Sequence, residues 1–198
     1  MKVGVLALQG DVREHMSSLI ACGVDPISVR RSSEIDQVDA LVLPGGESTT
    51  IAQLAEVFGI YDHLKKRIDE GMPVYGSCAG MILLANEILD SKVGQKTFGG
   101  LNITVRRNAF GRQVDSFETD IPFNDGSNEL VRAVFIRAPW VEKVGEGVEV
   151  LASVDNHPVA VRSKTLLATS FHPEITGDHR IHRYFIEEVA RPALEKVK

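Results

Sequence analysis

The sequence predicts an α/β fold, built on a mostly parallel, doubly wound sheet with helices on both faces and with antiparallel strands added to it. Two observations lead to this prediction. The first ninety residues alternate short apolar runs, typical of buried parallel strands, with amphipathic segments of helical period. The rest consists mostly of β-type runs separated by Gly, Asn, Asp and Pro, and closes with one amphipathic helical segment.

Each element follows from a local pattern. The strands expected in the first half are apolar runs: 2–8, 27–31, 39–46 and 73–78. The helices expected between and after them have capping or stop residues near their ends: 11–22, 47–59, 60–71 and 79–89. In the first of these helices, Asp11 and Glu14 have the spacing of a capping box, and Gly23 suits the position after the last turn.

The strands of the second half have the alternation and turn residues of hairpins: 100–110, 113–121, 133–139, 148–156, 157–163 and 165–173. Residues 178–190 are expected to form the closing helix. Because no repeat or linker composition divides the chain, residues 1–198 are expected to form a single domain.

Composition limits the classes of partner. The net charge is −5 and no Lys/Arg cluster occurs, so we expect no nucleic acid as a partner. No apolar run has the length of a membrane span, so we expect no membrane association either. The two cysteines, Cys22 and Cys78, do not form the pattern of a secreted disulfide scaffold, which predicts a cytoplasmic protein.

Cys78 is the first candidate for chemistry. It lies in Gly76-Ser77-Cys78-Ala79-Gly80, where an apolar strand gives way to a helix, and only small residues can make so tight a bend. At a helix N-terminus the free N–H groups stabilise a thiolate, and the N–H of Ala79 could face a developing oxyanion. A cysteine is more often a small core residue, but the glycine frame favours a nucleophile here.

The segment Ser170-Phe171-His172-Pro173-Glu174 supplies a base and its orienting acid. In an extended segment residues two apart project to the same side, so Glu174 could reach His172 and set its tautomer. Alone, this pattern fits a surface turn; with the elbow, it predicts a triad. The remaining helical histidines have charged neighbours and are expected on solvated faces: His15, His63, His179 and His182. We expect no metal site, since no further Cys/His cluster has ligand spacing.

Pro44-Gly45-Gly46 ends the third strand, and its glycines would let backbone N–H groups approach a ligand closely. A plain turn before a helix is the simpler interpretation. The lysine and glycine spacings of nucleotide-binding loops are missing, so nucleotide binding has little support.

The residues together resemble a family. GSCAG (76–80), SFHPE (170–174) and PGG (44–46) are similar to class I, triad-type glutamine amidotransferases. LQGDVREH (8–15), LPGGESTT (43–50), RNAFGRQVDSFE (107–118) and FIRAP (135–139) resemble more narrowly the glutaminase subunits of pyridoxal 5′-phosphate synthases, over nearly the whole chain.

The resemblance implies hydrolysis of L-glutamine to glutamate and ammonia, without a cofactor, and delivery of the ammonia to a partner synthase subunit in a hetero-oligomer. It implies Cys78 as nucleophile with His172 and Glu174 completing the triad, and Gly46 and Ala79 as the oxyanion hole. The glutamine would be bound by a set of residues from several loops: Gly46, Glu47, Ser48, Arg107, Ile136 and Arg137.

Other functions stay open at this point. A glutaminase of the same fold could serve a synthase that makes an imidazole or an aminobenzoate product. A binding or redox-sensing module of the same fold would not turn over glutamine, and an intact Cys-His-Glu set speaks against it. A cysteine peptidase would need an open cleft, which a sequence does not show.

Overall fold

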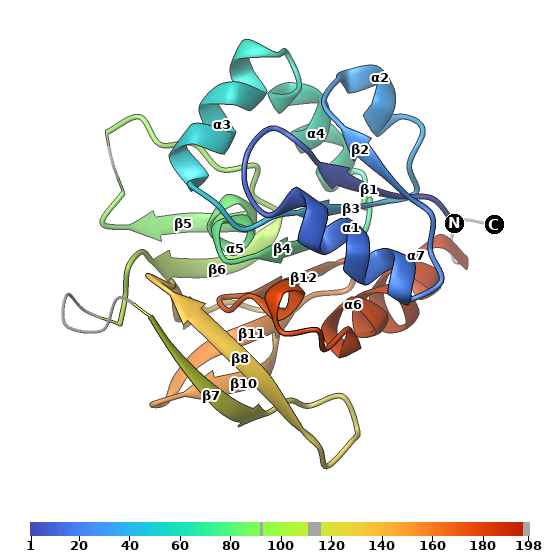
Figure 1. The fold of residues 1–198 in the computed structure, drawn as a ribbon. Coiled ribbons are helices and arrows are strands. Elements are labelled where there is room, and N and C mark those ends of the chain that lie inside the picture. The colour runs from blue at the N-terminus through green and yellow to red at the C-terminus, as the bar shows by residue number, and fades with distance from the viewer. Residues whose placement is uncertain (92, 111–115, 196–198) are drawn as a thin grey trace.

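The computed structural model of the chain describes residues 1–91, 93–110 and 116–195. Its centre is a seven-stranded sheet in the order β10-β11-β12-β4-β3-β1-β2 (Figure 1). Five neighbouring strands, from β12 to β2, are parallel, and β11 and β10 extend the sheet by antiparallel pairing. The strands of this sheet in chain order are Val3–Leu6 (β1), Pro26–Val29 (β2), Ala40–Leu43 (β3), Val74–Ser77 (β4), Glu149–Val154 (β10), His157–Arg162 (β11) and Leu166–Thr169 (β12).

Helices cover both faces of the sheet, as the alternating pattern predicts. Successive strand residues point to opposite faces, so Leu41 packs into one apolar cluster and Val42 into the other. One face carries Ser48–Val57 (α3), Tyr61–Asp69 (α4) and Ala79–Leu84 (α5). The other carries Val12–Ala21 (α1), Arg180–Tyr184 (α6) and the π-helical Phe185–Ala190 (η2). The prediction of a doubly wound sheet is therefore confirmed.

Two smaller sheets and short helices complete the described fold. Ala85–Leu89 (β5), Leu101–Arg106 (β6) and Trp140–Val144 (β9) form a three-stranded sheet, and Ser116–Pro122 (β7) and Leu130–Ile136 (β8) form a two-stranded ribbon. Ser32–Ile35 (α2) follows β2, and Arg191–Glu195 (α7) continues the final helical segment. In Figure 1 the ribbon β7–β8 projects below the central sheet on the side of β10 and β11.

The prediction of a helix over 79–89 is wrong for the second half of this range. Helix α5 ends at Leu84, Ala85 is extended (φ −66°, ψ 141°), and β5 pairs in parallel with β6. The N–H groups of Phe98 and Gly99 donate to the carbonyl of Leu83 and satisfy the end of the short helix. This pairing partner lies more than ten residues away, so a tertiary contact overrides a local helical pattern.

Two of the histidines expected on solvated faces are buried. His63 is partly exposed and bonds to Asp36, but His15 and His182 have no exposed surface. They lie on α1 and α6, which pack against each other beneath the sheet. The prediction of solvated faces relied on charged sequence neighbours. In a helix, however, residues at adjacent positions point in different directions, so a histidine next to charged residues can still be buried.

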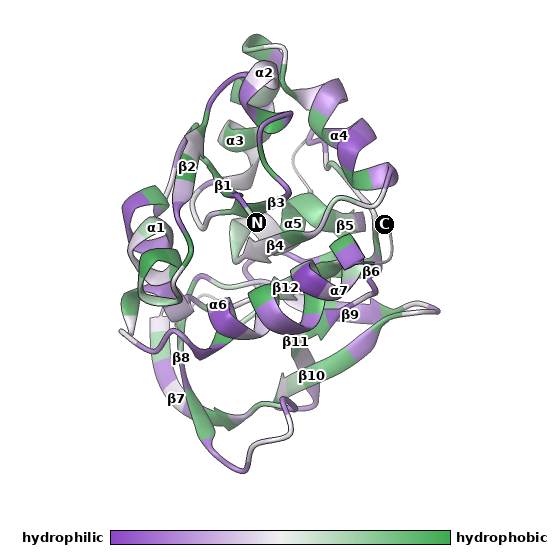
Figure 2. Ribbon diagram, turned by 90° about the vertical axis from the view of Figure 1, so that its right-hand side faces the viewer, coloured by the Kyte–Doolittle hydropathy of each residue, from purple (hydrophilic) through white to green (hydrophobic). Residues whose placement is uncertain are grey.

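The hydropathy of the ribbon follows the layers. In Figure 2 much of the α4 ribbon is purple, whereas green predominates along several of the central strands. That helix buries only Leu64 and Ile68. Within the described residues, no helix combines the length and the apolar character needed to cross a bilayer.

Candidate active site

Cys78 occupies a strained turn between β4 and α5. Its backbone has φ 48° and ψ −98°, a conformation that L-residues rarely adopt. The glycines around it are required by close packing. A Cβ on Gly76 would lie 2.4 Å from the carbonyl carbon of Gly80, and a Cβ on Gly80 would lie 2.4 Å from the carbonyl oxygen of Leu43. The bend therefore has the geometry that the sequence predicts, with Cys78 directly before the first residue of the helix.

His172 and Glu174 lie beside this turn because β12 is the parallel neighbour of β4. The two strands end together, with Thr169 opposite Ser77, so the segment after β12 continues next to the elbow. The imidazole Nδ1 of His172 is 2.7 Å from Oε1 of Glu174, and both side chains are buried. The hydroxyl of Ser77 donates to Oε2 of Glu174 at 3.2 Å, which fixes the second oxygen. Glu174 itself lies in the short 3-10 helix Pro173–Ile175 (η1).

The surroundings of His172 favour its protonated form. Burial of the ring opposes a positive charge, but hydrogen bonds to Asp11, Cys78 and Glu174 outweigh burial and raise the pKa of His172 to about 12. The ring is thus flanked by the thiol on one side and by carboxylates on the other. Since Nδ1 faces Glu174, Nε2 is the nitrogen available to the sulfur.

The sequence predicts that Asp11 caps α1, but in the structure it does not. Its side chain makes no capping hydrogen bond, although the helix does end as expected, with Gly23 at φ +78°. The carboxylate instead lies 3.4 Å from Nδ1 of His172. A local pattern with Glu14 predicts a cap, whereas the segment after β12 supplies His172, a stronger, charged partner.

The segment after β3 presents its backbone to the same site. The carbonyl of Gly45 accepts a hydrogen bond from the N–H of Asp11 (3.1 Å). The described peptide bonds are trans, so the N–H of Gly46 points away from Asp11. In the sheet order, β3 lies between β1, which leads to Asp11, and β4, which leads to Cys78. This orientation therefore directs the N–H of Gly46 to the side of the elbow.

A cavity of about 200 Å³ lies over Cys78. Its lining contains the elbow, the residues after β3 and the ends of β6 and β8: Gly46, Glu47, Ser48, Cys78, Ala79, Ile82, Arg107, Asn108, Ile136, Arg137 and Pro139. Every residue expected to bind glutamine or to form the oxyanion hole lies on this wall. Ile82, Asn108 and Pro139 were missed, although each lies within or next to a motif that the sequence singles out. The cavity is small for a polypeptide and suits a small polar ligand.

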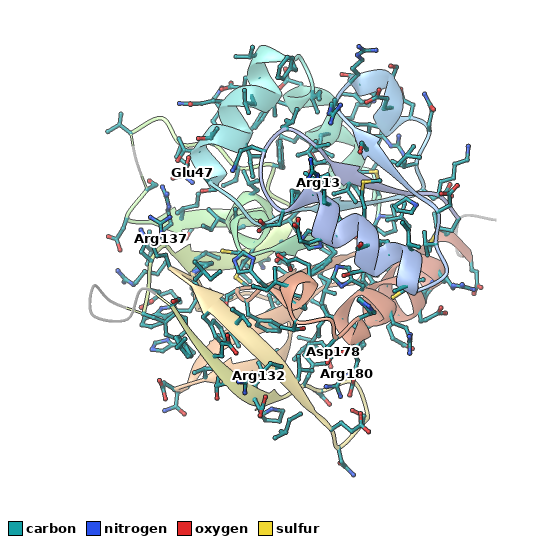
Figure 3. All side chains as sticks on the ribbon, in the orientation of Figure 1. Arg13, Glu47, Arg132, Arg137, Asp178 and Arg180 are labelled. Atoms are coloured by element: carbon teal, nitrogen blue, oxygen red, sulfur yellow. The ribbon has the colours of Figure 1, made fainter. Side chains whose placement is uncertain are left out.

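The polar wall of the cavity is organised by an ion pair. Nη2 of Arg107 lies 3.1 Å from Oε1 of Glu47, and Nη1 donates to the amide oxygen of Gln95. Glu47 also accepts from the N–H of Thr50 (2.7 Å) and so caps α3. Arg137 is exposed and has φ 44° at the end of β8; Figure 3 shows it and Glu47 on the same side of the molecule.

Comparison with known proteins agrees with this geometry. The model of the SNO glutamine amidotransferase family matches residues 5–191. The chain belongs to this family. A Parafrankia protein named pyridoxal 5′-phosphate synthase subunit PdxT is 60% identical over 188 residues, which cover 95% of this chain and 93% of that protein. The protein of the same name from Nocardia farcinica is 59% identical over 192 residues, which cover 94% of this chain and 85% of that protein.

Solved structures with this fold superpose well on the chain. A crystal structure described as a glutamine amidotransferase has a TM-score of 0.87 and 50% identity, covering 93% of this chain and 97% of that one. The structure of PurLQS from Thermotoga maritima has a TM-score of 0.64 at 17% identity, covering 100% and 98%, and shows the shared fold alone. Of the motif RNAFGRQVDSFE, residues 111–115 lie outside the described part of the chain.

Proposed function

We propose that this family member is the glutaminase subunit of a pyridoxal 5′-phosphate synthase. It hydrolyses L-glutamine to L-glutamate and ammonia and supplies the ammonia to a partner synthase subunit in a hetero-oligomer. The observation that carries the proposal is the strained Cys78 at the floor of a small polar cavity, beside the pair His172–Glu174. The names of the relatives support the pathway.

The first half of the reaction forms a thioester. The thiolate of Cys78 attacks the carboxamide carbon of glutamine, a C–S bond forms, and the carbonyl electron pair moves to the oxygen. The N–H groups of Gly46 and Ala79 stabilise this oxyanion; losing one such donor typically costs about 2.7–4 kcal/mol. As the C–N bond breaks, Nε2 of His172 gives its proton to the nitrogen, and ammonia leaves.

The second half hydrolyses the thioester. Neutral His172 takes a proton from water at Nε2, and the hydroxide attacks the thioester carbon. The C–S bond breaks with its electron pair on sulfur, so the product leaves as a carboxylic acid that gives its proton to solvent and becomes glutamate. The thiolate of Cys78 returns, paired with the imidazolium. Glu174 holds Nδ1 of the ring throughout and stabilises the imidazolium, which its 2.7 Å contact supports.

The cavity wall has the charges that an amino acid requires. Arg107 and Arg137 suit the α-carboxylate, and Glu47 suits the α-ammonium group, with Ser48 and Ile136 completing the wall. Arg107 already faces Glu47 at 3.1 Å, so the two are held ready for a ligand that carries both charges. A cytoplasmic location is part of the proposal, since both cysteines are free thiols.

The test is release of ammonia and glutamate from L-glutamine. The purified chain is assayed alone and with the synthase subunit, with Cys78→Ala as control. Turnover that depends on the partner and is lost in the variant supports both chemistry and pathway. A folded chain with a reduced Cys78 that releases no ammonia in either mixture would contradict the proposal and favour a binding module. Turnover stimulated by a different synthase would keep the chemistry and overturn the pathway.

A further inference from the structure

The triad adjoins a pair of buried histidines that the proposed reaction does not use. Nδ1 of His15 lies 2.9 Å from Nε2 of His182, and both rings have no exposed surface. Nε2 of His15 faces Oε1 of Glu174 at 3.6 Å. The phenol ring of Tyr75 packs edge-on against both imidazoles, with centroids 6.0 and 5.6 Å away. The ring of His15 therefore lies against Glu174, and His182 and Tyr75 pack around that ring.

The contacts select one arrangement of protons. A single proton lies between His15 and His182, so one nitrogen donates and the other accepts. Within the described part of the chain, Nε2 of His15 has no hydrogen-bond partner, and the carboxylate is the group it faces. A lone pair on that nitrogen would repel the carboxylate, whereas an N–H is attracted to it. His15 therefore carries its proton on Nε2 and accepts the N–H of His182 on Nδ1.

The environment keeps both imidazoles neutral. Burial, followed by repulsion from His182 and His172, places the pKa of His15 well below its usual value. Burial, followed by repulsion from His179, lowers the pKa of His182 to about 3. The titratable groups that face the pair come from β4, the segment around η1, and the start of α6: Tyr75, His172, Glu174 and His179.

We propose that His15 and His182 are positioning residues of the glutaminase site, forming a neutral chain that orients Glu174 through an N–H of His15. A neutral donor fixes the carboxylate without cancelling its charge, so Glu174 keeps its full attraction for Nδ1–H of His172. With Ser77 on the other oxygen, the carboxylate is held on three sides. This inference rests on the proposed function of the triad.

Variants of His15 distinguish positioning from packing. In His15→Gln the amide nitrogen reaches the place of Nε2 and keeps a donor toward Glu174; in His15→Phe a ring of similar size has none. Assayed with the synthase subunit, His15→Phe is expected to lower kcat about 10- to 100-fold, since a misplaced catalytic group loses rate on this scale. KM should stay within about twofold, and His15→Gln should recover most of kcat. His182→Phe should also lower kcat, but by a smaller factor than His15→Phe.

The control is His63→Phe, which changes a partly exposed histidine that bonds to Asp36 and does not line the cavity, and it should leave kcat unchanged. Folding is checked for each variant by circular dichroism and urea titration. A folded His15→Phe with wild-type kcat would overturn the inference, as would a His15→Gln variant as slow as His15→Phe.

A measurement on the wild-type protein covers the case in which the phenylalanine variants do not fold. Nitrogen-15 NMR of the imidazole rings reports which nitrogen carries the proton. The expected result is that His15 and His182 are both neutral at pH 7 with the proton on Nε2. A proton on Nδ1 of His15, or a charged ring, would refute the chain. This readout does not depend on activity, so failure of the proposed function and failure of this inference can be told apart.

Discussion

Gly45→Ala tests how tightly the segment after β3 packs on the imidazole of His172, the proposed catalytic base. A Cβ at this position would lie 2.5 Å from Cε1 of His172 and 2.7 Å from Oδ2 of Asp11. Gly45 is not among the glycines with positive φ, so alanine adds no backbone strain of its own. The whole effect of the variant must therefore come from the contact with the two side chains.

The size of the effect follows from the distances. Ordinary contact begins at 3.4 Å, so the ring of His172 must retreat by about 0.9 Å, and its 2.7 Å bond to Glu174 opposes the movement. Misplacing a catalytic group by about 1 Å can cost about 100-fold in rate, or about 2.7 kcal/mol at about 1.4 kcal/mol for each tenfold. We expect kcat to fall about 100-fold, with a smaller effect on KM.

The assay is glutamine hydrolysis in the presence of the synthase subunit, with urea unfolding measured in parallel. Gly71→Ala is the matched control, because Gly71 has φ +94° and no atom within 4 Å of an added Cβ. Gly71→Ala should lower the free energy of unfolding by about 1 kcal/mol through backbone strain and leave kcat unchanged. If Gly45→Ala is folded and keeps kcat within threefold of the wild type, the ring of His172 does not lie against Gly45 during turnover.

Three further predictions concern the cavity, the elbow and the buried histidines. Arg107→Ala should raise the KM for glutamine about 10- to 100-fold with a smaller change in kcat, because in the proposed function it removes a charged hydrogen bond to the substrate; an unchanged KM in steady-state kinetics would contradict the proposed role of Arg107. Gly80→Ala should destabilise the fold by more than about 2 kcal/mol in urea titration, because its Cβ would meet the carbonyl of Leu43 at 2.4 Å; wild-type stability would be incompatible with this elbow. Stability should fall as the pH drops from 6.5 toward 3, because His182 takes up a proton more readily in the unfolded chain. At pH 5, which is 1.5 units below the ordinary pKa of 6.5, the loss from His182 is about 2 kcal/mol, and His182→Phe should lack this part of the pH dependence.

The parts of the site that the sequence reveals are those set by local geometry. Gly76 and Gly80 frame Cys78 within five residues, and the structure shows the strained φ and the close contacts that require them. The pairing of His172 with Glu174 is likewise local, being made across one proline. The sequence predicts an antiparallel, hairpin-type strand over 165–173, but β12 also pairs in parallel with β4, and this pairing brings the two segments together at one edge of the sheet.

The parts that the sequence hides depend on distant partners. Asp11 has the pattern of a cap, yet it faces His172, which lies between β12 and η1, far along the chain. His15 has charged neighbours, yet α6 covers it with His182. Residues 85–89 continue a helical pattern, yet β6 recruits them into a sheet. In each case a contact between remote segments outweighs the local preference.

Trapping the covalent intermediate tests the assignment of Cys78 most directly. The complex is mixed with L-glutamine, quenched in acid during turnover, digested and analysed by mass spectrometry. A glutamyl thioester on the peptide that contains Cys78, missing from Cys78→Ala and cleaved by hydroxylamine, is the expected result. Ammonia release without any adduct on this peptide, or an adduct on Cys22 instead, would contradict Cys78 as the nucleophile.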